Sequence, residues 1–217
     1  MQTLTERVYK LAPPGGLFDE SVVRNLFPDL SVGAKKLLVH RAVKHGEVLR
    51  LKPGCYCLAP DYRKSHLHPF VVAAVLHSPS HISLESALSH HGLIPEAVQI
   101  VSSVTSRRSR SFKTPLGHFS FQRVPAGNPA AGVRAVKVDR NSWAFIAGPL
   151  RALADLIYVR KDVRWEPKGL RFLTESMRME EEDLYGIPMN EFEEVIESMQ
   201  NNRVRRYLTH FRDVIGR

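Results

Sequence analysis

The segment that most constrains the fold is a basic helical pattern directly followed by two short β-like runs. Apolar residues recur at helical spacing between positions 31 and 45, and Gly46 stands where a glycine commonly ends a helix. Residues 47–51 and 55–58 contain strand-forming side chains and flank a Pro-Gly turn. The pattern therefore predicts a helix that leads into a tight two-stranded ribbon.

Two shorter helices are expected upstream of this segment, over residues 3–11 and 20–27. Asp19 stands directly before the second helix and is a residue type that caps helix N-termini. Two helices, a basic helix and a hairpin, in this order, are typical of a winged helix-turn-helix, whose recognition helix enters the DNA major groove. We therefore interpret residues 1–60 as a winged helix-turn-helix DNA-binding domain.

The cationic side chains of this domain identify its candidate DNA contacts. Lysine and arginine can donate to guanine in the major groove or neutralise phosphates. A basic helix face that is only solvated is the alternative, and the ribbon that follows favours DNA binding. The candidate DNA-binding residues are Lys35, Lys36, His40, Arg41 and Lys44 of the helix, and Arg50 and Lys52 of the ribbon.

Positive charge is spread unevenly along the 217 residues, whose net charge is +9. Residues 1–62 contain nine Lys/Arg against six Asp/Glu, and residues 63–140 contain ten against three. Residues 141–217 contain twelve against thirteen, so the middle part of the chain is the most cationic. This asymmetry indicates a polyanionic partner, most commonly nucleic acid, and solubility alone does not account for it.

The remainder of the chain, residues 66–217, predicts a domain with a small sheet and packed helices. The fold class of the whole chain is therefore α+β. An acidic run at residues 180–183 favours a helix start there or is simply solvated. Expected strands are residues 98–104, 117–124, 133–138 and 143–147, and expected helices are residues 68–77, 84–91, a segment from 149 onward, 189–199 and 203–214.

The densest run of positive charge lies between two expected strands, so we expect it to form an exposed loop or the end of a ribbon. It includes an aromatic side chain suited to stacking on a base. The run can contact RNA, a nucleotide or another polyanion, and a solvated hairpin tip is the alternative. Its candidate binding residues are Arg107, Arg108, Arg110, Phe112 and Lys113.

Cys55 and Cys57, the two cysteines of the chain, stand two apart in an expected strand, so both side chains should point to one face. Such a pair is a poor disulfide and lacks zinc-ligand spacing, so we expect reduced thiols and a cytoplasmic protein. Residues 1–6 show no secretory pattern, and the longest apolar run, residues 70–76, is far too short to span a bilayer. No membrane partner is therefore expected.

Ten histidines raise the question of a metal site. The closest sets are His66 with His68 and His90 with His91, and neither has a cysteine or carboxylate at ligand spacing. We expect no metal, no cofactor and no enzymatic activity, because the nucleophile elbow, the phosphate-binding loop and the zinc-protease motif are all missing from the sequence. A nuclease targeted to DNA by the N-terminal domain is the enzymatic alternative.

Three blocks of sequence follow one another along the chain. Residues 54–60 read Gly-Cys-Tyr-Cys-Leu-Ala-Pro, residues 82–96 read Ile-Ser-Leu-Glu-Ser-Ala-Leu-Ser-His-His-Gly-Leu-Ile-Pro-Glu, and residues 105–119 read Thr-Ser-Arg-Arg-Ser-Arg-Ser-Phe-Lys-Thr-Pro-Leu-Gly-His-Phe. In this order they resemble AbiEi-type antitoxins of the AbiE family. The resemblance spans approximately residues 31–121 and does not rest on residues 150–217.

The resemblance implies a type IV toxin–antitoxin system of the kind that acts in abortive infection and phage defence. In such a system the N-terminal domain represses its own operon, and we expect operator DNA with inverted repeats because repressors often bind as pairs. The C-terminal domain would counter a nucleotidyltransferase-like toxin, and a direct stable complex with it is not required. The alternative is a stand-alone winged-helix regulator that senses a ligand in its second domain, and a neighbouring toxin gene would distinguish the two.

Overall fold

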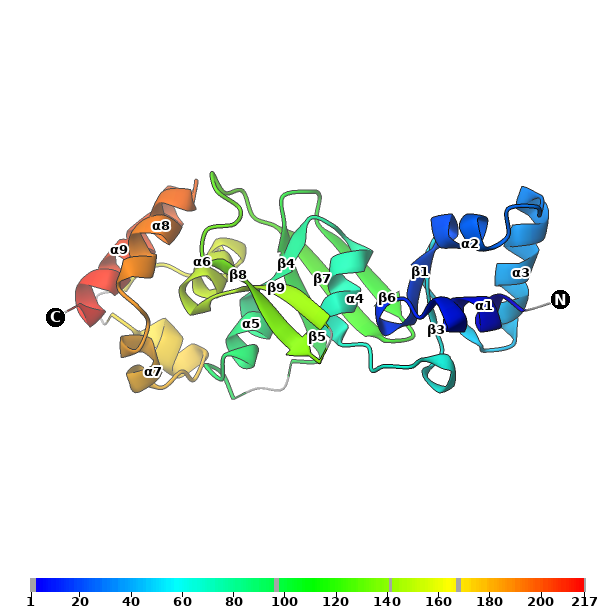
Figure 1. Ribbon diagram of the computed structural model, residues 1–217. Coiled ribbons are helices and arrows are strands. Elements are labelled where there is room, and N and C mark those ends of the chain that lie inside the picture. Colours follow the sequence, from blue (N-terminus) through cyan, green and yellow to red (C-terminus); the bar gives the residue numbers. More distant parts are fainter. Residues whose placement is uncertain (1–2, 96–97, 141, 167–168, 217) are drawn as a thin grey trace.

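The computed structural model describes residues 3–95, 98–140, 142–166 and 169–216. The molecule is elongated, with an N-terminal unit at one end, a large sheet in the middle and the last helices at the other end (Figure 1). Its mixed helices and strands confirm the expected α+β class. Two separate clusters of buried side chains, one in the N-terminal unit and one in the rest of the chain, form the cores.

The N-terminal unit, residues 3–58, contains three helices and a three-stranded sheet with the strand order β1-β3-β2. Asp19 begins the second helix, because its carboxylate accepts the N–H groups of Ser21 and Val22. The Ser21 hydroxyl and the backbone N–H of Val22 also lower the pKa of Asp19. The elements are α1 (Leu4–Leu11), β1 (Leu17–Asp19), α2 (Glu20–Leu26), α3 (Val32–Lys44), β2 (Val48–Lys52) and β3 (Cys55–Leu58), with a 3-10 turn at Pro14–Gly16.

Strand β3 lies between the two cores, and its alternation assigns one face to each. Tyr56 and Leu58 belong to the core under α1, α2 and α3. Cys55 and Cys57 point the other way, as expected for residues two apart, and join the core of the second unit. Both thiols are free and buried, and burial raises the pKa of Cys57 to about 11. The small sheet therefore fastens the N-terminal unit to the rest of the molecule.

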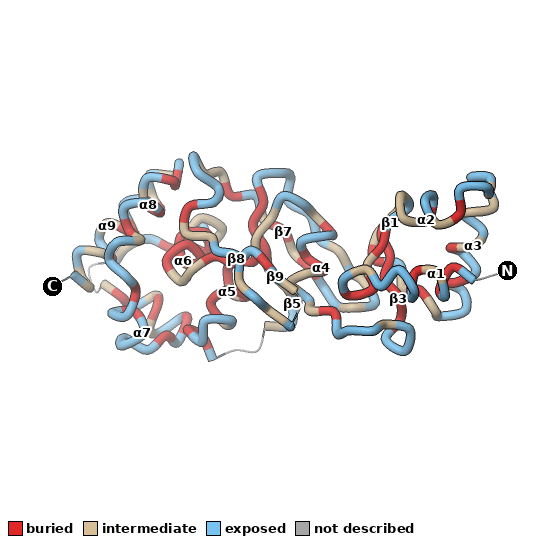
Figure 2. The backbone as a smooth tube through the Cα atoms, in the orientation of Figure 1, coloured by how far each residue is buried: buried red, intermediate tan, exposed pale blue. Residues whose placement is uncertain are grey.

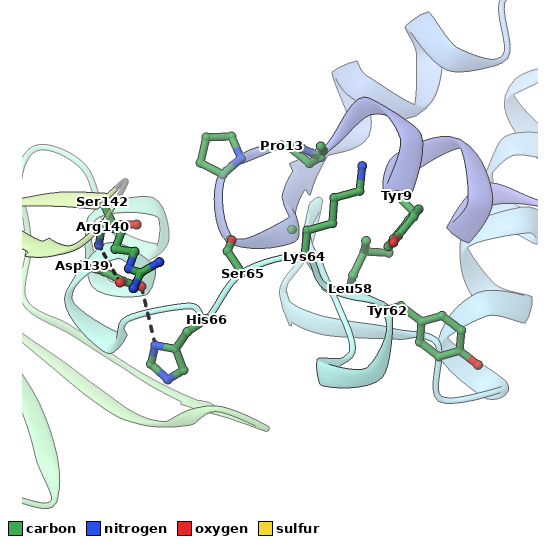
Figure 3. A pocket seen from close by; sticks show the side chains of 14 residues that line it. Tyr9, Pro13, Leu58, Tyr62, Lys64, Ser65, His66, Asp139, Arg140 and Ser142 are labelled. Carbon is green, nitrogen blue, oxygen red and sulfur yellow. Dashed lines mark hydrogen bonds and ion pairs between the residues drawn. The ribbon is translucent and has the colours of Figure 1, made fainter.

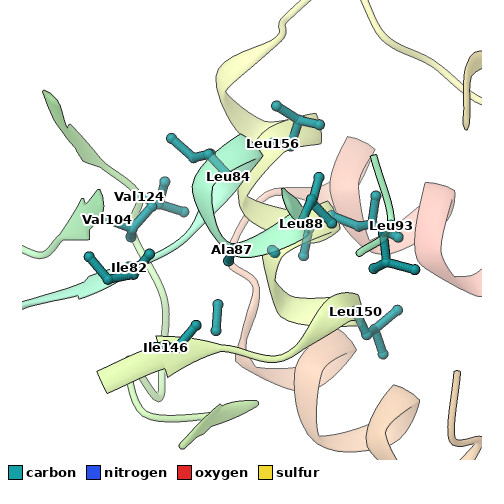
Figure 4. Packing of buried hydrophobic residues seen from close by; sticks show 14 of the residues in the cluster. Ile82, Leu84, Ala87, Leu88, Leu93, Val104, Val124, Ile146, Leu150 and Leu156 are labelled. Carbon is teal, nitrogen blue, oxygen red and sulfur yellow. The ribbon is translucent and has the colours of Figure 1, made fainter. Parts of the chain in front are cut away.

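The second unit, residues 69–216, is built on a six-stranded sheet with the order β6-β7-β5-β4-β9-β8. The pairs β5–β7 and β4–β9 are parallel, and the other pairs are antiparallel. Helices α4 (Pro69–Leu76) and α5 (Leu84–His90) pack on this sheet. Figure 4 shows apolar side chains of α5, Leu84 and Leu88 among them, in the same cluster as Ile82 of β4, Val104 of β5 and Ile146 of β9. Its strands are β4 (Ser80–Ile82), β5 (Ile100–Thr105), β6 (Arg110–Thr114), β7 (Gly117–Arg123), β8 (Val133–Asp139) and β9 (Ser142–Ala147).

The later helices of the second unit, from residue 149 onward, gather beyond the sheet (Figure 1). Arg203 ties two of them together, because its guanidinium donates to the carbonyl oxygens of Ile157 (2.7 Å) and Tyr158 (3.3 Å). The acidic run begins a short helix, as its first-turn carboxylates favour. The helices are α4 (Pro69–Leu76), α5 (Leu84–His90), α6 (Pro149–Val159), α7 (Glu181–Tyr185), α8 (Asn190–Ser198) and α9 (Asn202–Ile215), with a π-helical turn at Phe172–Ser176 and a 3-10 turn at Pro60–Tyr62.

Three strands were not expected from the sequence. β1 and β4 have only three residues each, which is too short for a periodic pattern to stand out. β6, residues 110–114, takes up the second part of the basic run, so the predicted exposed loop is limited to residues 107–109 and the rest is a paired strand. Residues 110–114 form a strand because each pairs with a residue of β7, from Arg110 with Phe121 to Thr114 with Gly117.

Candidate nucleic-acid interface

Helix α3 turns its apolar side to the core and its cations to solvent (Figure 2 shows the exposure along the chain). The Ser31 hydroxyl accepts the N–H of Ala34 at 3.2 Å and starts the helix, and Gly46 follows it at φ 75°. Val39 and Ala42 are buried inward. The exposed side chains are Val32, Lys36, Leu37, His40, Arg41 and Lys44.

A hollow of about 500 Å³ lies between α2, α3 and the strands β2 and β3. Its floor is apolar, and its rim contains four of the seven cations predicted to bind DNA. Arg24 of α2 also lines it; this residue lies within the predicted helix of residues 20–27 but was not among the predicted DNA contacts. The predicted residues that meet here are Lys35, Lys36, His40 and Arg50.

Arg41 and Lys44 lie further round α3 and do not line this hollow. Both are exposed in the last turn of the helix, where their positive charge interacts favourably with the negative end of the helix dipole and stabilises the helix. Since successive residues are 100° apart, Lys44 continues the side that begins with Lys36 and His40. The helix therefore presents a broad cationic side rather than a single row.

Lys52 lies elsewhere. Its ammonium donates to the carbonyl oxygens of Val75 (3.0 Å) and Leu76 (2.8 Å) at the C-terminal end of α4. These contacts hold the β2–β3 turn against the second unit. The ribbon is present as predicted, but its Lys52 does not share a surface with the cations of α3.

The basic run at residues 107–113 has two parts: residues 107–109 form a loop, and residues 110–113 belong to β6. Arg107, Arg108, Arg110 and Lys113 are exposed. Phe112 is half-buried, with its ring 5.8 Å from that of Phe121 and 6.4 Å from that of His77. The cations are thus available to a ligand, but the predicted stacking residue packs against the core.

A second cavity, of about 530 Å³, separates the two units (Figure 3). The Lys64 ammonium lies 4.6 Å from the centre of the Tyr9 ring on one side. On the other side His66 Nδ1 lies 3.9 Å from Asp139 Oδ2, next to Arg140. The cavity is therefore lined by both units and by the segment that joins them.

A buried polar cluster holds α6 to the sheet. Asp155 is fully buried and accepts the Ser83 hydroxyl at 2.7 Å and Arg151 Nε at 3.0 Å, and His81 Nε2 lies 3.4 Å away. Burial raises the pKa of Asp155, but the hydrogen bond from His81 and the charge of Arg151 more than offset it and leave that pKa below its usual value. Arg151 also donates to the carbonyl oxygen of Ala131 at 2.9 Å.

Within the described residues, histidine, cysteine, aspartate and glutamate side chains form no group of three that could hold a metal ion. Over the same residues, every helix is too short or too polar to cross a membrane. No protein-family model matches the chain, and no curated protein is significantly similar to it. The interface is therefore interpreted from its own geometry.

Proposed function

We propose that the N-terminal unit is a winged helix-turn-helix that binds double-stranded DNA through α3. The observation that carries this proposal is the exposed cationic side of α3, which stands at the end of the molecule and clear of the second unit (Figure 1). The order α1, α2, α3, β2, β3 agrees with that fold. Lys35 and Lys36 occupy the first turn of α3, the part of a recognition helix that meets base edges.

We further propose that the chain is the DNA-binding antitoxin of a type IV toxin–antitoxin system and represses its own operon. This step rests on the resemblance of residues 54–60, 82–96 and 105–119 to AbiEi-type antitoxins. The exposed cations of β6 are candidates for the function that counters the toxin, since they lie on the second unit. We do not propose Lys52 as a DNA contact, because its ammonium already donates to carbonyl oxygens of α4. We do not propose Phe112 as a stacking residue, because its ring packs against Phe121.

The test is a titration of the full chain with duplex DNA taken from immediately upstream of its own gene. Lys36→Ala with Lys44→Ala should weaken binding at least tenfold, since a base contact is worth about 1–3 kcal/mol. Each phosphate contact that the variant loses should also make the slope of log binding constant against log salt concentration shallower by about 0.9. The control is Lys10→Ala with Lys161→Ala, which removes the same charge from exposed positions outside the interface. Equal affinity of the two double variants would refute the assignment of α3.

A second candidate function has one observation in its favour. The cavity between the units is lined by Lys64, His66 and Arg140, and a ligand there would contact both units at once. A stand-alone regulator could use such a site to couple a small molecule to DNA binding. The two candidates separate in a growth assay: rescue of cells that express a neighbouring nucleotidyltransferase-like gene supports the antitoxin, and no rescue supports the regulator.

A further inference from the structure

The hairpin of β8 and β9 exposes two large aromatic side chains on one face. Trp143 and Phe145 are each 61% exposed, whereas Ala144 and Ile146, which alternate with them, are buried. The two strands lie at one border of the six-stranded sheet (Figure 1). Exposed aromatics of this size on a sheet face mark a binding surface, because leaving them in water is unfavourable.

The partners of these aromatics across the hairpin are known from the strand register. Lys137 pairs with Trp143, and Ala135 pairs with Phe145. Directly opposite residues share a face, so the Lys137 ammonium stands beside the indole with only a small side chain next to the phenyl ring. The carboxylate of Asp139, at the end of β8, accepts the N–H of Arg140 at 2.6 Å and lies near His66. The face is therefore aromatic, with one cation, Lys137, opposite Trp143 and the Asp139 carboxylate at the end of the hairpin.

A cavity of about 340 Å³ adjoins Phe145. His81, Thr105 and Ser106 provide polar groups to its lining, and Arg151 forms part of its wall. Arg151 is 1% exposed, and within the described chain its Nη2 has no hydrogen-bond partner. This volume exceeds that of a nucleobase. His81 Nε2 is already paired with Asp155, and the Thr105 hydroxyl donates to the carbonyl oxygen of Pro79, so Ser106 is the exposed polar side chain of this set.

We propose that this face binds single-stranded nucleic acid, with consecutive bases stacked on Trp143 and Phe145 and a neighbouring base in the adjoining cavity. Side chains two apart in a strand are separated by about 7 Å, which matches successive unstacked bases. Stacking accepts any base, and Lys137, which lies opposite Trp143, can neutralise a phosphate. A polyanion also suits the surrounding part of the chain, since residues 63–140 contain ten Lys/Arg against three Asp/Glu. This surface is separate from the duplex-binding side of α3.

The tryptophans allow a direct test, because Trp143 and Trp165 are the two in the chain. In a Trp165→Phe background, titration with oligo(U) or oligo(dT) of roughly twelve nucleotides, a length typical of such sites, should quench the emission of Trp143. Anisotropy of a labelled oligonucleotide should show that Trp143→Ala and Phe145→Ala each weaken binding roughly tenfold, as expected when one stacking partner is removed. Tyr185→Ala is the matched control, because Tyr185 is 51% exposed on α7, and it should bind like the parent.

Three results would overturn the proposal. They are the lack of quenching by either oligonucleotide, equal affinity of Trp143→Ala and its parent, and a dimer in sedimentation that Trp143→Ala converts to monomer. The Lys36→Ala, Lys44→Ala double variant separates this surface from α3, since it should retain the single-strand quenching. If the parent quenched with single strands but did not bind duplex DNA, the role of α3 would be refuted and this proposal would stand. If the parent bound duplex DNA but showed no quenching, this proposal would be refuted and the role of α3 would stand.

Discussion

Helix α3 and strand β6 both present dense positive charge, but their secondary structures distribute it differently. In α3, residues 100° apart spread the cations over a broad convex side while Val39 and Ala42 stay inside. In β6, alternation sends Phe112 toward the core and leaves Ser111 and Lys113 on the other face. A convex helix fits a DNA groove, whereas β6 divides its two cations between faces, with Arg110 on the side of Phe112 and Lys113 on the other. Similar charge density therefore predicts different partners.

The largest expected effect is on stability, and it comes from breaking the buried cluster of Asp155, Arg151 and Ser83, which joins α6 to the sheet that contains β6. Asp155→Ala leaves the Arg151 guanidinium buried without its carboxylate partner. Breaking a buried pair in this way costs about 3–5 kcal/mol. We therefore expect that loss in the free energy of unfolding, measured by denaturant titration with tryptophan fluorescence, since both tryptophans lie in the second unit.

Asp213→Ala is the control for this prediction, because its pair with Arg212 is exposed at the surface. A surface pair of this kind contributes about 0–1 kcal/mol. If Asp155→Ala were no more destabilising than Asp213→Ala, the cluster would not be what holds α6 to the sheet. Neither change should alter the packing of α3 while the chain is folded, because α3 belongs to the other core.

The next prediction sharpens the contrast within β6. Phe112→Ala should lower the free energy of unfolding by about 2 kcal/mol, because it removes a half-buried ring that packs against Phe121 and His77. Lys113→Ala, one residue on, should change it by less than about 0.5 kcal/mol, since that side chain is exposed. Thermal denaturation of the two variants checks this. If Phe112→Ala were as stable as the parent, the Phe112 ring would not contribute to the core, and it would again be a candidate for binding a ligand.

The sequence predicted the helices and the longer strands well because their periodic patterns are local. It placed α3 and its end at Gly46, and the β2–β3 ribbon, close to the observed bounds. It missed β6 because a strand whose exposed residues are arginine and lysine reads as a loop until its partner β7 is known. Pairing between distant residues was the missing information.

The candidate site shows the same limit. Charge alone placed Lys52 with the cations of α3, but its contact with the end of α4 depends on how the two units pack. Trp143 and Phe145 lay in a predicted strand, and their alternation with Ala144 was visible in the sequence. Which side of that strand faces water was not, because it depends on where α4 and α5 lie on the sheet.

The smallest expected effect concerns α4, whose C-terminal end contacts Lys52 of β2. Its C-terminal carbonyls accept from Lys52, and its first turn is capped by His68, whose Nδ1 accepts the N–H of Phe70 at 3.2 Å. Only the neutral imidazole can accept this bond. Burial, followed by the charges of His66 and His90, lowers the pKa of His68 from 6.5.

Because the folded pKa of His68 is depressed, its contribution to stability is present above pH 6.5 and is lost as the pH falls through the folded value. His68→Asn keeps a side chain that caps helices and does not titrate. The difference in unfolding free energy between the parent and this variant should therefore shift by at most about 1 kcal/mol in favour of the variant on acidification. His90, whose pKa is also lowered, is present in both proteins and cancels in the difference. If the pH profiles of the two proteins were parallel, the cap on α4 would be insensitive to protonation. The helix that accepts from Lys52 of the N-terminal unit would then have no acid-labile cap at its first turn.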